Sequence, residues 1–435
     1  MSEVRLSNMQ RTIIVLLIIS ASFLSVLMMF LLITAFPKIM QEFSVNSTEV
    51  QWLTTGFMLT MAVLIPITAY FIDTFTTRTI IISAMSLFIL GTVISLFSTS
   101  FSVMLLGRII QGMGSGIMMP LMQTVLFLIY PRDQRGYAMG LAGMVINVAR
   151  AVGPPVSGVL IKYLGWRSLF YVPLPIAIII LILMLIFMKN VTEQKETEID
   201  ILSIFLSAIG FGGTLFGFTN IQESDSLSLL SLASLIIGIS AIAFFTVRQL
   251  RLEKPILGVR VLKTPIFSLV TFISIIAFSL LISFETIMPM YVQNAQGYSA
   301  YYGGLVVMPG ALTLALMSFV AGKLFDKFGG RIIAIIGFML ISLSGIGSYL
   351  WLDLESPFAL SMGLFMISMA GAALINMPIM TIGINALPDS LIPHGTSVIN
   401  TVRQLGGTIG ITFIISFLSR AEGKKAALDP AQYLT

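Results

Sequence analysis

Long apolar segments follow one another along most of the chain, and short polar connections separate them. A helix that crosses a bilayer needs about 20 mainly apolar residues, so each segment predicts one membrane-spanning helix. We place thirteen such segments at 12–36, 50–72, 79–98, 103–129, 137–160, 168–188, 201–220, 228–247, 266–290, 302–322, 331–351, 358–381 and 395–419. The pattern therefore predicts an all-α polytopic membrane protein.

The last segment is followed by a polar stretch, residues 419–435, where a further span would be expected. We therefore expect thirteen visible spans and a fourteenth helix beyond the sequence. The first segment is too long for a cleavable signal peptide and lacks a small-residue cleavage site, so we expect it to be kept as a span.

The composition supports this prediction and excludes several classes of protein. Of the 435 residues, 57% are hydrophobic and 10% are charged, whereas a soluble domain carries about 25% charged residues. A soluble enzyme and a disordered chain are therefore excluded, and the absence of cysteine excludes a disulfide scaffold. The net charge of +5 is not gathered into a polybasic stripe, so we expect no nucleic-acid partner.

The lysines and arginines predict the orientation. With a cytoplasmic N-terminus, fifteen of the 24 basic residues fall in cytoplasmic segments, six on the opposite side and three within spans. Cytoplasmic loops of membrane proteins are enriched in Lys and Arg. We therefore expect a multi-pass protein of a bacterial plasma membrane whose N-terminus is cytoplasmic.

Five residues of the first half recur in the second half at one constant offset of 253 positions. The pairs are Asp73 and Asp326, Arg78 and Arg331, Asn147 and Asn400, Arg150 and Arg403, and Gly153 and Gly406. This repeat predicts two bundles of six helices, at 1–190 and 264–435, the last helix of the second being absent, with an inserted helix pair and its linkers at 191–263. Two parallel repeats are typical of transporters with a binding site near the membrane midplane.

The first motif is a tight polar turn, Gly322 to Arg331, in which Asp326 and Arg331 repeat Asp73 and Arg78 of the first half. An acid and a base at such a turn can pair with each other and with neighbouring helix ends. We therefore predict that these four charged residues form a conformational latch. Ordinary loop charges that only set the topology are the alternative.

The second motif, Arg108-x-x-Gln111-Gly112, places an arginine inside an apolar segment. Charged residues within spans are usually functional, so Arg108 is a candidate for the transport mechanism. The alternative is that Arg108 lies near the start of its span and extends its side chain to the outer interface.

The third motif, Gly153-Pro154-Pro155-x-x-Gly158, combines prolines that bend a helix with glycines that permit close helix contact. Together the three motifs resemble those of the major facilitator superfamily, and within it the fourteen-span drug:proton antiporters of the EmrB/QacA type, as in Gram-positive bacteria. The resemblance covers the whole chain and implies the fold of that superfamily. It also implies that Arg108 assists proton coupling and that the Gly/Pro motif marks an exporter, although Ser157 replaces one glycine of that motif.

Glu285 is the candidate proton carrier. The first span of many relatives contains an acid, but this chain has Met28 at that position and Phe30 where those relatives have threonine. Glu285 is the acidic residue that we place well inside a span, where hydrocarbon penalises its charged form. We expect it to exchange a proton near the working pH and to attract a cationic drug. A carboxylate near the outer interface, or one paired silently with an arginine, is the alternative.

Two arginines, Arg150 and Arg403, are predicted at the central cavity. Either is a candidate counter-ion of Glu285; alternatively, two central cations favour an anionic or zwitterionic substrate. The other residues assigned to the cavity are Asn147, Asn400, Gln123, Asn376, Met28 and Phe30. Hydrogen bonding between helices explains the amides equally well. The single histidine, His394, is expected in a solvated cytoplasmic loop.

Known signatures of catalysis do not occur in the sequence. It contains no Walker motif, metal-ligand cluster or nucleophile elbow, so we expect neither an enzyme nor a cofactor or metal, and an ion gradient remains as the energy source. We predict a monomeric, proton-coupled multidrug efflux antiporter that confers antibiotic resistance by exporting amphipathic cationic or zwitterionic drugs across the lipid bilayer by alternating access. A lipid or lipid-linked exporter on the same fold and a non-transporting membrane sensor are the alternatives.

Overall fold

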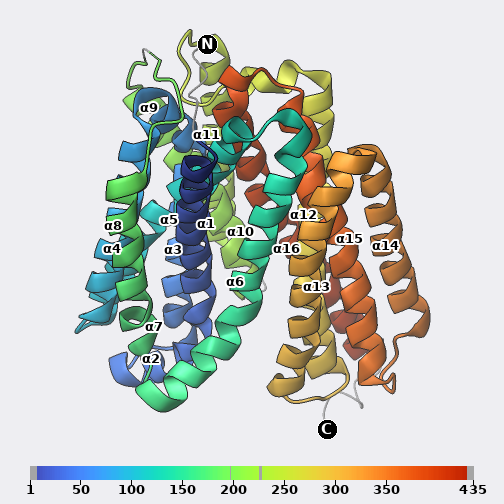
Figure 1. The fold of residues 1–435 in the computed structure, drawn as a ribbon. Coiled ribbons are helices and arrows are strands. Elements are labelled where there is room, and N and C mark those ends of the chain that lie inside the picture. The colour runs from blue at the N-terminus through green and yellow to red at the C-terminus, as the bar shows by residue number, and fades with distance from the viewer. Residues whose placement is uncertain (1–6, 196, 225–227, 429–435) are drawn as a thin grey trace.

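The computed structural model describes residues 7–195, 197–224 and 228–428, which form helices joined by turns and loops (Figure 1). Twelve stretches of these described residues are long and apolar enough to cross a membrane. The thirteenth predicted segment lies in α16 (Ile392–Leu428). This helix continues past the predicted end at 419, so part of the expected polar tail is helical, and residues 429–435 of that tail lie outside the described residues.

The first bundle is built from six long helices with two short ones. Its long helices are α1 (Asn8–Leu31), α3 (Ser47–Thr74), α4 (Thr77–Leu96), α5 (Phe101–Ile129), α6 (Arg135–Leu164) and α8 (Pro173–Phe187). The short helices α2 (Phe36–Phe43) and α7 (Ser168–Tyr171) lie at the end opposite the N-terminus (Figure 1). Helix α1 ends at Leu31, before the predicted end at 36, because a 3-10 turn follows it. Pro37 lies in the first turn of α2, where a proline needs no backbone donor.

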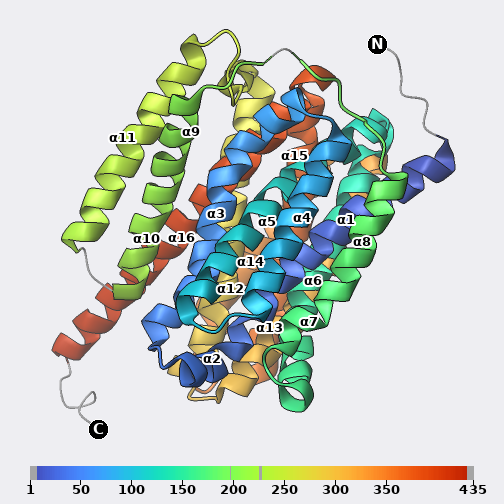
Figure 2. The same ribbon diagram turned by 90° about the vertical axis from the view of Figure 1, so that its left-hand side faces the viewer.

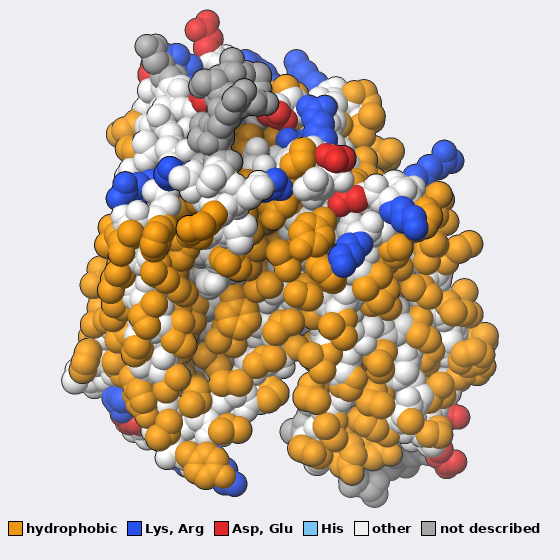
Figure 3. Space-filling model, viewed as in Figure 1, with side chains coloured by type: hydrophobic (Ala, Val, Ile, Leu, Met, Phe, Trp, Pro, Cys, Tyr) orange, Lys and Arg blue, Asp and Glu red, His pale blue; other side chains and the backbone are white. Residues whose placement is uncertain are grey.

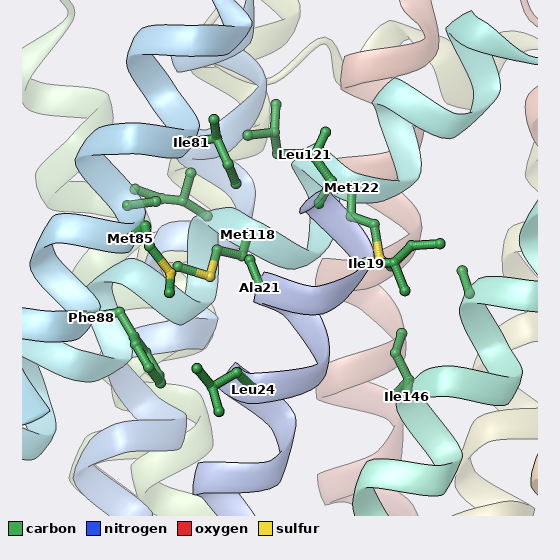
Figure 4. Packing of buried hydrophobic residues seen from close by; sticks show 14 of the residues in the cluster. Ile19, Ala21, Leu24, Ile81, Met85, Phe88, Met118, Leu121, Met122 and Ile146 are labelled. Carbon is green, nitrogen blue, oxygen red and sulfur yellow. The ribbon is translucent and has the colours of Figure 1, made fainter. Parts of the chain in front are cut away.

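The core of this bundle consists of large apolar side chains between α1, α4, α5 and α6. Figure 4 shows Met85 and Phe88 of α4 facing Met118 and Leu121 of α5, with Leu24 of α1 beside them. Glycines permit the close packing of α4 and α5: a Cβ atom on Gly107 would lie 2.9 Å from the carbonyl oxygen of Gly91. The bundle therefore has a rigid apolar interior on which polar side chains can be positioned.

The second bundle contains five described helices. They are α12 (Pro265–Met290), α13 (Ala300–Phe328), α14 (Gly330–Trp351), α15 (Phe358–Asn385) and α16. Its core is apolar too, and it centres on Phe365 and Met369 of α15. A π-helical turn, Tyr291–Ala295, continues α12 at its far end.

The inserted helices form a pair at one edge of the molecule. The first span combines α9 (Ile201–Ser207), a π-helical turn and α10 (Gly213–Ser224), and the second is α11 (Leu229–Arg251). Figure 2 shows this pair outside α3 and α16, one helix from each bundle, and the contacts of α10 agree with that placement. Arg248 donates two hydrogen bonds to Asp200 and thereby joins the two inserted spans at one end. The same guanidinium holds the pKa of the Asp200 carboxyl below its usual value.

The two bundles touch at the end of the molecule that holds the N-terminus and separate at the other end. Helix α6 packs along α13, and α16 packs against α3 and α5. A Cβ atom on Gly140 would lie 2.8 Å from the Cα atom of Gly322, so the α6 and α13 backbones are in direct contact there. At the opposite end a cleft opens between the bundles (Figure 3), where α6 curves away from α13 (Figure 1).

Candidate transport site

An ion pair joins the two bundles across the cleft. Arg150 of α6 donates from Nη1 to both carboxylate oxygens of Glu285 of α12, at 2.8 Å and 3.1 Å. Both side chains are about one-fifth exposed, at 21% and 20%, so the pair is neither sealed in the core nor free in solvent. Glu285 therefore has an arginine partner, as one of the sequence-based alternatives proposed, and that arginine comes from the other bundle.

Arg403 lies in the same region, but its partners are an amide and an aromatic ring and not a carboxylate. Its Nη2 donates to Oδ1 of Asn376 at 2.9 Å, and its guanidinium stacks on the ring of Phe278 at 4.8 Å from the centroid. Arg403 is 7% exposed, and its Nη1 has no hydrogen-bond partner. Phe278 and Glu285 are seven residues apart on α12, so they lie on the same face of that helix, two turns from each other. The predicted pair of central arginines therefore forms one cluster with Glu285.

The predicted cavity residue Phe30 belongs to this cluster, whereas Met28 does not. The ring of Phe30 on α1 faces the Arg150 guanidinium at 5.4 Å. Met28 is 1% exposed and packs within the apolar core, because an α1 position two residues away points about 200° around the helix. The assignment of Met28 to the cavity is corrected accordingly.

Three of the four predicted amides join the bundles, and the fourth, Asn376, bonds within the second bundle. Asn400 of α16 donates to Gln123 of α5 at 2.5 Å, and Asn147 of α6 donates to Ser318 of α13 at 3.2 Å. Beside Gln123, the hydroxyl groups of Thr124 and Thr396 are 2.8 Å apart. These contacts cross from one bundle to the other, so any opening of the closed end must break them.

Arg108 is enclosed in the first bundle. Its side chain is fully buried, with Nε donating to the carbonyl of Leu53 at 3.1 Å and Nη1 to Gln111 at 2.5 Å. Nη1 also donates to the carbonyl of Met28, and the guanidinium stacks on Phe57 at 4.3 Å. Arg108 therefore does not extend to the interface, and it holds α1, α3 and α5 together.

The Gly/Pro motif brings α6 against the end of α1. Helix α6 runs through Pro154 and Pro155 without a break, and a Cβ atom on Gly153 would lie 3.0 Å from Cβ of Phe30. Ser157, the departure from the family pattern, donates to the carbonyl of Leu31 at 2.6 Å. Gly158 has open space beside it. The motif therefore shapes the part of α6 that carries Arg150 and forms one wall of the cleft.

Asp73 is the centre of a polar cluster at the closed end. Its carboxylate accepts from Lys195 Nζ at 2.8 Å and lies 3.0 Å from His394 Nε2. The backbone N–H of Gly258 donates to His394 Nδ1 at 2.9 Å. His394 is therefore buried at the start of α16, which corrects the expectation of a solvated loop. The linkers on both sides of the inserted pair, through Lys195 and Gly258, contact this cluster.

Asp326 makes the equivalent contact from the second bundle. Its two carboxylate oxygens accept from the backbone N–H groups of Gly136 and Tyr137, at 2.9 Å and 2.7 Å. These groups lie in the first turn of α6, where the helix dipole favours a negative charge. The predicted basic partners lie elsewhere: Arg78 donates to the carbonyl of Leu185, and Arg331 is exposed and makes no ion pair within the described part of the chain.

Sequence reasoning missed the contacts by which Arg135 and Lys195 reach the second bundle at the closed end. Arg135 of α6 donates to Asn385 at 3.0 Å and to Asp389 at 3.1 Å, and Lys195 donates to the carbonyl of Ser390. The internal repeat does not mark Arg135, because the position 253 residues later is Pro388. Among the described residues, no group of His, Asp or Glu is arranged to hold a metal ion.

The two bundles meet at a closed end, are joined by ion pairs and leave a cleft at the other end. This arrangement is typical of polytopic membrane transporters. Residues 18–411 match the Major Facilitator Superfamily. The chain therefore belongs to this superfamily, as the sequence motifs indicated, and it is a multi-pass membrane protein.

Individual relatives agree with this assignment. The chain is 47% identical over 409 residues to the uncharacterised MFS-type transporter YcnB of Bacillus subtilis, with 94% of this chain and 86% of that protein covered. It is 37% identical to the lincomycin resistance protein LmrB of Listeria monocytogenes, with 92% and 84% covered. The fold is similar to that of the human organic anion transporter MFSD10, with a TM-score of 0.69 at 13% identity and 93% of both chains covered.

Proposed function

We propose that the chain is a proton-coupled multidrug exporter that works as an antiporter in a bacterial plasma membrane. The observation that carries the proposal is the ion pair between Arg150 and Glu285, which joins the two bundles and is reached from the cleft. A carboxylate in this place can hold either a cation or a proton, but not both. Exchange of one for the other is the chemistry that an antiporter needs.

The direction of transport follows from the proposed orientation. Charged side chains gather at the end that holds the N-terminus (Figure 3), in keeping with the excess of basic residues expected on the cytoplasmic side. The cleft then faces outward. A proton entering from outside neutralises Glu285 and releases the cation bound there, and the proton gradient supplies the energy without a cofactor.

The latch residues support alternating access. Asp73 and Asp326 each bind the start of a helix in the other bundle, so together they favour the state with a closed cytoplasmic end. Breaking both contacts would let the bundles rock to the opposite state. We assign proton coupling to Glu285, assisted by Arg108 through the packing of α1, α3 and α5.

Among the relatives, LmrB is named for lincomycin resistance and MdtP of Bacillus subtilis, 28% identical, is named a multidrug transporter. These names support drugs as the substrates. The acid and the arginines at the cleft favour amphipathic compounds that are cationic or zwitterionic. We propose that the chain acts as a monomer, because the two bundles of a single chain form the whole cleft.

The test is drug efflux from proteoliposomes driven by an imposed pH gradient. Glu285→Gln keeps the size of the side chain and removes its titration, so we expect pH-driven efflux to fall at least about tenfold while downhill drug exchange continues. Glu355→Gln, at an exposed position between α14 and α15, is the matched control and should behave as the unaltered chain. Undiminished pH-driven efflux by Glu285→Gln would sink the proposal.

A further inference from the structure

The charges at the cleft do not balance. The cluster contains two guanidinium groups, those of Arg150 and Arg403, and one carboxylate, that of Glu285. Within the described part of the chain, Arg403 makes no ion pair, and its buried Nη1 has no hydrogen-bond partner. Arg150 uses only Nη1 to bind Glu285, and its buried Nε is also without a partner. Unpaired donors of this kind are expensive in a medium of low dielectric.

We propose that the substrate is a zwitterionic amphipath whose cationic group takes the place of Arg150 at Glu285 and whose anionic group binds Arg150 and Arg403. The inference rests on the function proposed above, since the same site is used, and it selects one of the two substrate classes. In the free protein, Arg150 then occupies the position of the substrate's cation.

The net charge of the cluster with substrate bound differs between a simple cation and a zwitterion. Without substrate the three side chains carry a net charge of +1. A simple cation that displaces Arg150 from Glu285 raises the charge to +2 and leaves both arginines without an acid. A zwitterion keeps the charge at +1 and replaces one ion pair with two. The second arrangement is favoured because an uncompensated buried charge is strongly destabilising.

A zwitterion bound in this way still competes with a proton for Glu285. The proton and the cationic group of a zwitterion bind the same Glu285 carboxylate, so they exclude each other. The anionic group binds the arginines, which stay charged throughout. A zwitterion can therefore be exchanged for a proton, whereas a simple anion would bind best when Glu285 is protonated and would travel with the proton.

Aromatic rings next to the arginines fit the apolar part of such a substrate. Phe30 lies beside the guanidinium of Arg150, and Phe278 lies beside that of Arg403, at 5.4 Å and 4.8 Å. These rings belong to α1 and α12, one in each bundle. A flat aromatic body between them would keep its charged groups near Glu285 and the arginines.

The experiment compares two dyes with one ring system. Rhodamine B carries a carboxylate and is a zwitterion, and rhodamine B ethyl ester is a permanent cation. Their pH-driven efflux from proteoliposomes is measured for the unaltered chain, Arg403→Gln, Arg403→Lys and the control Arg251→Gln, which removes a charge from the exposed end of α11. We expect half-saturation of the unaltered chain at a roughly tenfold lower concentration of the zwitterion than of the ester.

Arg403→Gln should remove this preference by weakening efflux of the zwitterion, with efflux of the ester unchanged or improved. Arg403→Lys should restore part of the preference, and Arg251→Gln should keep all of it. Equal handling of the two dyes by the unaltered chain, no efflux of the zwitterion, or an equal loss for both dyes in Arg403→Gln would overturn the inference. Proton-driven efflux of the ester alone would overturn the zwitterion assignment and leave the exporter in place, whereas efflux independent of the pH gradient would remove the proposed function itself.

Discussion

The Nε2 atom of His394 lies 3.0 Å from the Oδ2 atom of Asp73, although 321 positions separate the two residues in the sequence. The backbone N–H of Gly258 donates to Nδ1 of the same ring, so Nδ1 must be unprotonated. The ring therefore accepts at Nδ1 and donates from Nε2 to the carboxylate of Asp73.

Replacing His394 should open the closed end. His394→Ala removes the donor to Asp73 and leaves Lys195 as its side-chain partner. A hydrogen bond to a charged group contributes about 1.5–3 kcal/mol, so the open population should rise roughly ten- to a hundredfold. The measurement is made in inside-out membrane vesicles, by labelling a cysteine placed at the buried position Thr124 with a maleimide that cannot cross the membrane. His394→Gln, which keeps a donor, should be closer to the unaltered chain, and unchanged labelling in His394→Ala would contradict the latch.

A methyl group on α13 should block closure. A Cβ atom on Gly322 would lie 2.4 Å from the carbonyl oxygen of Gly136 on α6, and backbone cannot yield as a flexible side chain can. We expect Gly322→Ala to slow transport several-fold and to raise labelling at position 124. Gly304→Ala on the same helix is the control, because its Cβ atom meets open space. If both variants transport at the same rate, the close contact of α6 and α13 is not needed for the cycle.

A disulfide should trap the closed end. The hydroxyl oxygens of Thr124 and Thr396 are 2.8 Å apart, and a disulfide requires about 2.05 Å between sulfurs, so a small shift permits the bond. The 435 residues contain no cysteine, hence the double variant Thr124→Cys with Thr396→Cys needs no other change. Oxidation should abolish transport, and reduction should restore it. Either single variant should be insensitive to oxidant, and transport by the oxidised double variant would show that this end need not open.

Lysine should be a poor replacement for Arg108. The guanidinium donates to acceptors on α1, α3 and α5 at once, and a lysine ammonium lacks its planar arrangement of donors. We expect Arg108→Lys to lower the thermal unfolding midpoint in detergent by several degrees, since it loses one or more hydrogen bonds of a charged group. Arg331→Lys, at an exposed turn, should leave the midpoint unchanged. Equal midpoints for the two variants would mean that Arg108 does not hold the bundle together.

The sequence was informative wherever a local pattern determines structure. Apolar length predicted the spans, and the repeat offset paired Asp73 with Asp326, each of which binds a helix start in the other bundle. The partners in the Asp73 cluster could not be predicted, because Lys195, which donates to Asp73, and Gly258, which donates to His394, lie in linkers whose path depends on tertiary packing. His394 was assigned to a solvated loop for a related reason: polar residues near a proline resemble a loop until a neighbouring segment covers them.

Glu285 illustrates the same limit at the transport site. Its position within an apolar segment marked it as unusual, but the sequence left Arg150 and Arg403 as alternative counter-ions and a position near the outer membrane interface as a further alternative. The choice of Arg150 depends on how α6 and α12 face each other across the cleft. Which helices of the two bundles face each other depends on the folded chain. The spacing of residues along one helix therefore cannot predict this pairing.

The linkers through Lys195 and Gly258 make the inserted helices part of the closed end. Helices α9 to α11 stand at the edge of the protein (Figure 2). The linker before them and the linker after them each supply a hydrogen-bond donor to the Asp73 and His394 pair. A deletion of the helices together with these linkers would leave both bundles in the chain but would remove two contacts that hold this pair in place.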